Sequence, residues 1–99
     1  MEADFILTKT DLTTFKTTRL LADLPEEKAD SVTGYAISAS GKTIALIFNE
    51  GDTFELFDTH TSKSLGTYPT DSNVLFYSET EILCFNAADM EKGVLLISF

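Results

Sequence analysis

Short apolar runs separated by polar turns, between residues 32 and 68, constrain the fold of this 99-residue chain more than any other feature. The four runs are residues 35–38, 43–48, 53–57 and 64–68. They are rich in β-branched and aromatic residues, which favour strands. In the third run, Phe54 and Leu56 alternate with Glu55 and Phe57, as expected when successive side chains point to opposite faces of a sheet. The spacing predicts a four-stranded antiparallel meander.

A short polar motif occurs twice, each time between two apolar runs. Its pattern is D-x-x-T-x-K, at residues 11–16 and again at residues 58–63, an offset of 47. Downstream, residues 74–78, 81–85 and 94–99 predict three further strands. Gly51, before the third strand of the meander, is matched by Gly93, at an offset of 42. Offsets in the low to mid forties are typical of β-propeller blades.

These residues give the chain a resemblance to the WD-repeat β-propeller family. Phe57 and Asp58 stand where that family has Trp-Asp at the end of a blade's third strand, and Lys63 follows the next turn. The S-x-S-G-K pattern of residues 38–42 is similar to the family's usual turn between the first and second strands. The chain departs from the family because it has no Trp and no Gly-His pair before Val32. It also carries a one-residue insertion at residues 50–52, where the family usually has Asp-Gly.

The resemblance implies an all-β fold of antiparallel four-stranded meanders, in about two and a quarter β-propeller blades of the WD-repeat type. Residues 1–24 would be a partial blade of two strands, residues 32–68 a full blade, and residues 74–99 a partial blade of three strands. Such an array leaves at least one apolar sheet face and several strand edges open. We therefore expect a piece of a longer propeller, a ring closed by assembly, or instead a small sandwich or barrel that closes on itself.

Two segments could form single helical turns. In residues 23–30, Asp23 could cap the turn, because Glu26 follows three residues later and Pro25 suits a first-turn position. Residues 86–91 are the second candidate. Neither is long enough to be a stable helix alone, so both remain equally compatible with irregular linkers.

The charge balance excludes some partners. Seven basic and sixteen acidic residues give a net charge of −9, which disfavours direct binding to nucleic acid or to an anionic membrane. A solvated acidic surface is one interpretation, and a surface that recruits basic partners or imitates nucleic acid is the other. A single Cys84 suits a reducing compartment, and no secretory signal is recognisable, so we expect an intracellular protein, cytoplasmic or nuclear.

No catalytic constellation is recognisable in the sequence. Lys42 and Thr43 follow Gly41, but a phosphate loop would need a glycine at position 36, which is Ala, and a helix afterwards. One Cys and one His, His60, cannot make a zinc site, and residues 49–52 lack the ligand ladder of a calcium loop. We expect an exposed His60, no enzymatic activity, no metal and no cofactor.

Two functions remain open. The resemblance implies a non-enzymatic interaction scaffold or adaptor that binds protein partners, as a homo-oligomer or as part of a larger propeller. The net charge of −9 implies that these partners are basic. The alternative is a small stand-alone acidic β-protein that occupies the basic groove of a nucleic-acid-handling enzyme and inhibits it. The candidate partner-facing residues lie in three acidic loops: Glu26, Glu27, Asp30, Glu50, Asp52, Asp89 and Glu91.

Overall fold

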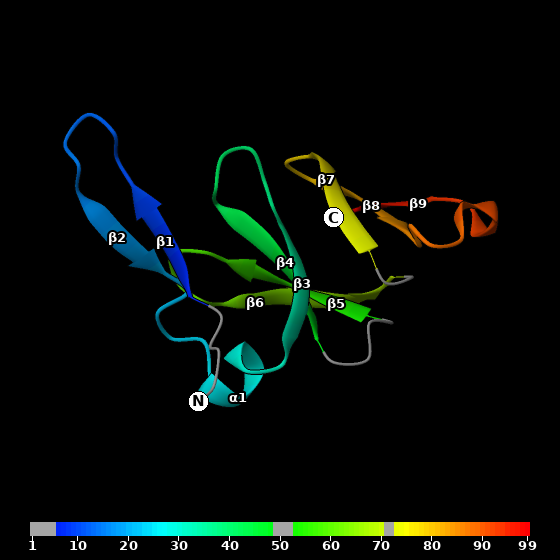
Figure 1. Cartoon of the computed structure of the whole chain (residues 1–99), viewed down its shortest axis with the longest axis horizontal. Coiled ribbons are helices and arrows are strands. Elements are labelled where there is room, and N and C mark those ends of the chain that lie inside the picture. The colour runs from blue at the N-terminus through cyan, green and yellow to red at the C-terminus, as the bar shows by residue number, and fades with distance from the viewer. Residues whose placement is uncertain (1–5, 49–52, 71–72) are drawn as a thin grey trace.

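Antiparallel β-sheets make up most of the chain in the computed structural model, which describes residues 6–48, 53–70 and 73–99. Within these residues the strands form three sheets that follow one another along the sequence (Figure 1). The N-terminal hairpin is β1 (Leu7–Thr10) and β2 (Thr17–Leu20). The middle sheet is β3 (Val32–Ile37), β4 (Thr43–Phe48), β5 (Thr53–Asp58) and β6 (Ser64–Pro69). The C-terminal sheet is β7 (Asn73–Ser78), β8 (Glu81–Phe85) and β9 (Leu95–Ser98).

The predicted all-β class is confirmed, and the strands lie where the apolar runs predicted them, with differences at the ends. The first run of the meander was expected at residues 35–38, whereas β3 begins at Val32 and ends at Ile37. Ser38 closes the turn instead, because its N–H donates to the Thr43 carbonyl and its hydroxyl oxygen accepts the Thr43 N–H. Residues 1–5, where the first predicted partial blade begins, lie outside the described residues.

A helical turn forms within the first predicted segment, and another overlaps the end of the second and extends one residue beyond it. Residues Glu26–Ala29 form α1, and Met90–Lys92 form a 3-10 turn, η1. The predicted cap is wrong: Pro25, not Asp23, stands at the N-cap position, with no side-chain hydrogen bond. The N–H of Asp23 instead donates to the hydroxyl of Ser62, which ties this loop to the turn after β5.

Strand β4 of the middle sheet is buried on both faces, and this position explains its composition. On β4, Ile44 and Leu46 point to one face and Ala45 and Ile47 to the other, and all four are buried. A strand covered on both sides needs an apolar residue at every position rather than at alternate ones. β4 is therefore the centre of the molecule.

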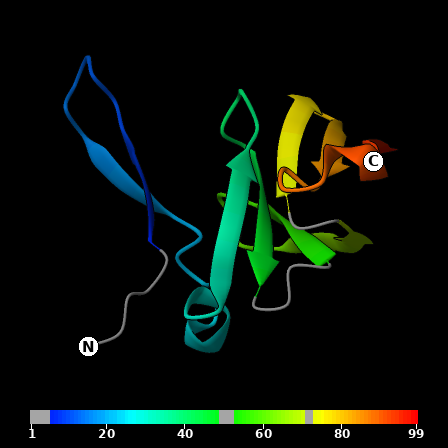
Figure 2. The same cartoon turned by 45° about the vertical axis from the view of Figure 1, so that its right-hand side comes forward.

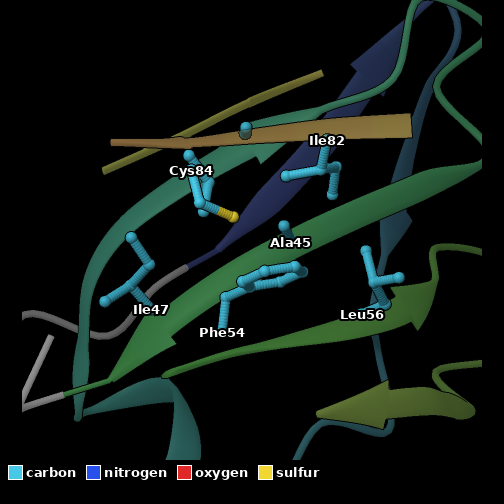
Figure 3. Packing of buried hydrophobic residues seen from close by; sticks show 8 residues of the cluster. Ala45, Ile47, Phe54, Leu56, Ile82 and Cys84 are labelled. Carbon is cyan, nitrogen blue, oxygen red and sulfur yellow. The ribbon is translucent and has the colours of Figure 1, made fainter. Parts of the chain in front are cut away.

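Two apolar clusters lie on the two faces of the middle sheet. Figure 3 shows the first, in which Ile82 and Cys84 of β8 point toward Ala45 and Phe54 of the middle sheet. In the second, Phe57 packs with Ile44, Leu46 and Leu21, and Leu7 of the N-terminal hairpin lies against it. Phe54 and Phe57 therefore face opposite sides, which confirms the predicted alternation along this strand.

Hydrogen bonds between turns join the three sheets. Thr59, fully buried, receives the N–H of Leu21 on its carbonyl at 2.8 Å and donates its own N–H to the Lys42 carbonyl at 3.0 Å. Its hydroxyl donates to the Gly41 carbonyl at 2.6 Å. On the other side, both carboxylate oxygens of Glu79 accept hydrogen bonds from Ser40, one from the N–H at 2.9 Å and one from the hydroxyl at 2.6 Å.

Candidate interaction surface

The two copies of the D-x-x-T-x-K motif fold into the same turn. In the first, the carboxylate of Asp11 accepts the N–H groups of Thr13 and Thr14 at 2.8 and 3.3 Å. In the second, the carboxylate of Asp58 accepts those of His60 and Thr61 at 2.9 and 3.0 Å. Local bonds of this kind favour turns over regular structure. The repeated sequence is therefore also a repeated structure.

The backbone of the two turns agrees in further detail. The N–H of Asp11 donates to the Lys16 carbonyl, and that of Asp58 to the Lys63 carbonyl, both at 2.9 Å. A residue with positive φ stands at the equivalent place in each turn, Phe15 at 58° and Ser62 at 62°. The amide donors hold the pKa of each aspartate below its ordinary value of 3.8.

The acidic loops named as partner-facing lie in separate parts of the molecule. Glu26, Glu27 and Asp30 are exposed on and after α1, below the middle sheet in Figure 1. Asp89 and Glu91 are exposed at η1, at the far end of the C-terminal sheet. Glu50 and Asp52 lie outside the described residues. The described members of this set therefore form two surfaces rather than one.

One ion pair beside α1 was not foreseen from the sequence. The ammonium of Lys28 lies 2.9 Å from the carboxylate of Glu55, whose side chain is only 14% exposed. The same ammonium lies 5.9 Å from the ring centre of Phe48 and 5.6 Å from that of Phe57, within reach of a cation–π interaction. Lys28 thus covers one end of the second apolar cluster, so part of the acidic loop is structural. The sequence did contain a signal for this ion pair. The alternation along residues 53–57 places Glu55 on the same strand face as the apolar Phe57, and a carboxylate beside an apolar cluster needs a partner.

An apolar row lies exposed on the outer face of the C-terminal sheet. Strand register places Leu75 opposite Leu83, and Leu83 opposite Leu96, in a line across β7, β8 and β9. Leu75 is 54% exposed and Leu96 45% exposed, and Leu83 is half-buried. Tyr77, two residues along β7, is 68% exposed. These three leucines are the outer leucine row.

The middle sheet carries a corresponding row on its equivalent face, the face directed away from the N-terminal hairpin. Ala36 lies opposite Ala45, and Ala45 opposite Leu56, across β3, β4 and β5. All three side chains are buried in the cluster that the C-terminal sheet covers. Figure 3 shows Ala45 and Leu56 in this cluster, and Figure 2 shows the C-terminal sheet beside the middle sheet. One apolar row is therefore covered by a following sheet, and its counterpart, the outer leucine row, lies uncovered in the described residues.

Among the described residues, no group of three or more His, Cys, Asp or Glu is placed to hold a metal ion. His60 is exposed, as predicted. Cys84 borders a cavity of about 480 Å³ between the end of β6 and the start of β9. Burial raises the pKa of its thiol above the ordinary value, so this thiol is a poor nucleophile at neutral pH.

No helix in the part of the chain that the structure describes is long and apolar enough to cross a membrane. Comparison of the chain with protein families, with curated proteins and with solved structures found no match.

Proposed function

We propose that this protein is a non-enzymatic interaction scaffold whose three sheets are β-propeller blades of the WD-repeat type, within a larger or oligomeric assembly. In that arrangement the N-terminal hairpin supplies the third and fourth strands of one blade. The middle sheet is a complete blade, and the C-terminal sheet supplies the first three strands of another. The common turn geometry at Asp11 and Asp58 supports the equivalence of the first two.

The outer leucine row is the observation that carries the proposal. Its counterpart on the middle sheet is buried by the next sheet, and three leucines in a line across a sheet are an unusual surface for a monomer. A further sheet of the same kind, from another chain or from a longer form of this one, would cover the row. The assembled sheets would then act as a rigid platform.

The acidic loops supply the contact surfaces in this proposal. Glu26 and Glu27 on α1, and Asp89 and Glu91 around η1, are exposed carboxylates that could attract basic segments of a partner. Attraction of this kind mainly accelerates association and weakens as salt is added. Partner binding through these loops would therefore be salt-dependent, whereas closure through the leucine row would not.

Absolute mass in solution tests the proposal. Light scattering after size exclusion, with circular dichroism alongside, would be measured for the wild type and for a variant carrying Leu75→Arg and Leu96→Arg. The control is Leu12→Arg, because Leu12 is an exposed leucine in the hairpin turn, away from the row. We expect a β-rich oligomer that the double variant dissociates and the control leaves intact.

Other outcomes decide between the alternatives. Aggregation of the wild type that the double variant relieves would indicate a face normally covered by more protein. A folded wild-type monomer at high concentration, unchanged by the double variant, would contradict the proposal. It would favour the small acidic inhibitor, whose binding to a basic groove should fall steeply with salt.

A further inference from the structure

A small polar cavity lies between the N-terminal hairpin and the turn after β5. Its volume is about 220 Å³, and the buried side chain of Leu20 forms part of its wall. The polar residues around it are Lys9, Asp11, Thr14, Lys16, Thr18 and His60. Two of the chain's seven basic residues and its one histidine therefore gather here, in a protein that is otherwise strongly acidic. We call this the hairpin cavity.

The internal repeat shows that the polarity of the hairpin cavity departs from the general pattern of the fold. At the offset of 47 between the two turns, Lys9 is equivalent to Leu56 and Thr18 to Leu65. Leu56 is fully buried in the core of the middle sheet, whereas Lys9 is exposed at the cavity. The hairpin thus carries a cation where the repeat carries the buried Leu56, and a hydroxyl where it carries Leu65, which is 46% exposed. The change from Leu56 to Lys9 puts a polar wall where the repeat has packed core.

Thr14 and, when its ring is protonated, His60 add further donors around the cavity. The hydroxyl oxygen of Thr14 accepts the N–H of Lys16 at 3.4 Å, which leaves its proton directed elsewhere. The single hydroxyl proton of Thr59 is given to the Gly41 carbonyl, so its contact with Nδ1 of His60 at 3.3 Å requires that Nδ1 carry the hydrogen. A protonated imidazole would then have Nε2–H for a ligand.

Asp11 is the one carboxylate in the cavity wall. One of its oxygens is engaged by the N–H groups of Thr13 and Thr14, and its negative charge opposes part of the field of Lys9 and Lys16. The long-range repulsion from the remaining acidic residues is screened over about 8–10 Å at physiological salt. Asp58 adds a second carboxylate beside the wall, because it accepts the N–H of His60 at 2.9 Å. The local balance between the ammonium groups of Lys9 and Lys16 and these two carboxylates therefore decides which ion enters.

We propose that the hairpin cavity binds a phosphate group. Two ammonium groups and two hydroxyls, joined by the His60 ring when it is protonated, provide more donors than the two oxygens of a carboxylate can use. The larger number of acceptor oxygens on a tetrahedral phosphate matches them. The phosphate can be a free ion or a monoester on a partner's side chain, and the chemistry of recognition is the same. This site is independent of the scaffold function proposed above.

The single histidine provides a direct probe of binding. The proton resonance of the His60 ring would be followed by NMR in the wild-type chain while inorganic phosphate is added at fixed pH, with chloride replaced so that ionic strength is constant. We expect a saturable shift with a Kd on the order of 1 mM or tighter. Chloride alone should give none, and a shift that fails to saturate would overturn the proposal.

Charge variants locate the site. Lys9→Ala and Lys16→Ala should each weaken phosphate binding by about two- to fivefold, as expected for exposed charges. Lys92→Ala removes the same charge at the other cavity and should leave binding unchanged. Asp11→Asn keeps an oxygen that can accept the two amide hydrogens but removes the negative charge, so it should tighten binding. Equal weakening by all three lysine variants would overturn the proposal, because it would indicate general screening.

A second titration separates the two sources of phosphate. A short phosphoserine peptide and its unphosphorylated form would be added to the same samples. Tighter binding of the phosphopeptide than of inorganic phosphate, lost with Lys9→Ala, would assign the site to a phosphorylated partner. Equal affinities would assign it to the free ion. Equal binding of both peptides, with no response to inorganic phosphate, would contradict a phosphate site.

Discussion

At the scale of single residues, Phe57 and Thr59 contribute in different ways to the same junction. Phe57 lies where the WD-repeat resemblance places a tryptophan, and it is 3% exposed among Leu21, Ile44 and Leu46. Thr59, two residues later, satisfies backbone groups of the neighbouring turns. An apolar contact and a set of hydrogen bonds therefore hold the hairpin against the middle sheet.

Replacing Phe57 tests the apolar half of this junction. Phe57→Ala should lower the free energy of unfolding by about 3–5 kcal/mol, because it removes a large buried side chain and leaves a cavity. Denaturant unfolding followed by circular dichroism would measure the change. Tyr77→Ala is the control, since a side chain that is 68% exposed should change stability by no more than about 0.5 kcal/mol. Near-neutral stability of Phe57→Ala would contradict its place in the core.

Acid should destabilise the protein through its turn carboxylates. The N–H groups of Thr61 and His60 hold the pKa of Asp58 below 3.8, and Asp11 is held low in the same way. A carboxyl with a lowered pKa in the folded state contributes its full stabilisation above the unfolded pKa. It loses that contribution as the pH falls through the folded value. The loss should therefore begin near pH 4 and continue below it.

The variant Asp58→Asn isolates this effect. It keeps an oxygen for the two amide bonds but does not titrate, so the decline in unfolding free energy below pH 4 should be shallower than in the wild type. Urea unfolding at a series of pH values would show the difference. Parallel curves for the two proteins would mean that Asp58 does not contribute to acid sensitivity.

At the scale of elements, the turns rather than the strands carry most of the specific side-chain bonding. Aspartate, threonine and serine side chains close the turns at residues 11–16, 38–43 and 58–63 by local bonds to the backbone. Local interactions of this kind can be recognised in a sequence, which explains why the strands were predicted within a few residues. The residue at the N-cap of α1 could not be predicted from the sequence, because Pro25 and Asp23 both suit the start of a helix.

Thr59→Val tests the bonding of a turn to its neighbours. Valine has nearly the same shape but cannot donate to the Gly41 carbonyl, so the free energy of unfolding should fall by about 1–3 kcal/mol. Thr59→Ser keeps the hydroxyl and should cost less. Thermal or denaturant unfolding of the two variants side by side makes the comparison. A larger loss with serine than with valine would show that the methyl group, not the hydrogen bond, matters at this position.

At the scale of the whole molecule, the C-terminal sheet depends on few contacts with the rest. One face packs on the middle sheet through Val74, Ile82 and Cys84, and the outer leucine row on the other face lies exposed. The paired bonds from Ser40 to Glu79 join the β3–β4 and β7–β8 turns, and the hydroxyl of Ser40 lowers the pKa of Glu79 below its ordinary value. This link should limit how freely the sheet opens.

Glu79→Ala should therefore increase amide hydrogen exchange in β7 and β8 more than in β4 and β5, because local opening reports the stability of each unit. Glu81→Ala is the matched control, since that carboxylate accepts a bond from Ser78 within the same sheet. Exchange measured by mass spectrometry or NMR would resolve the strands. Equal exchange in the two variants would show that the Glu79 link does not hold the sheets together.

The sequence by itself determined the β class, the strand positions, the repeated turn and the alternation of Phe54 and Phe57, because each follows from side-chain periodicity or from bonds between near neighbours. Only the tertiary structure decided which face of each sheet is covered. It paired Lys28 with Glu55, separated the acidic loops, left the outer leucine row exposed, and brought His60 to the cavity beside Lys9 and Lys16. These features join residues far apart in the chain, and their geometry depends on how the sheets pack, which no local pattern specifies.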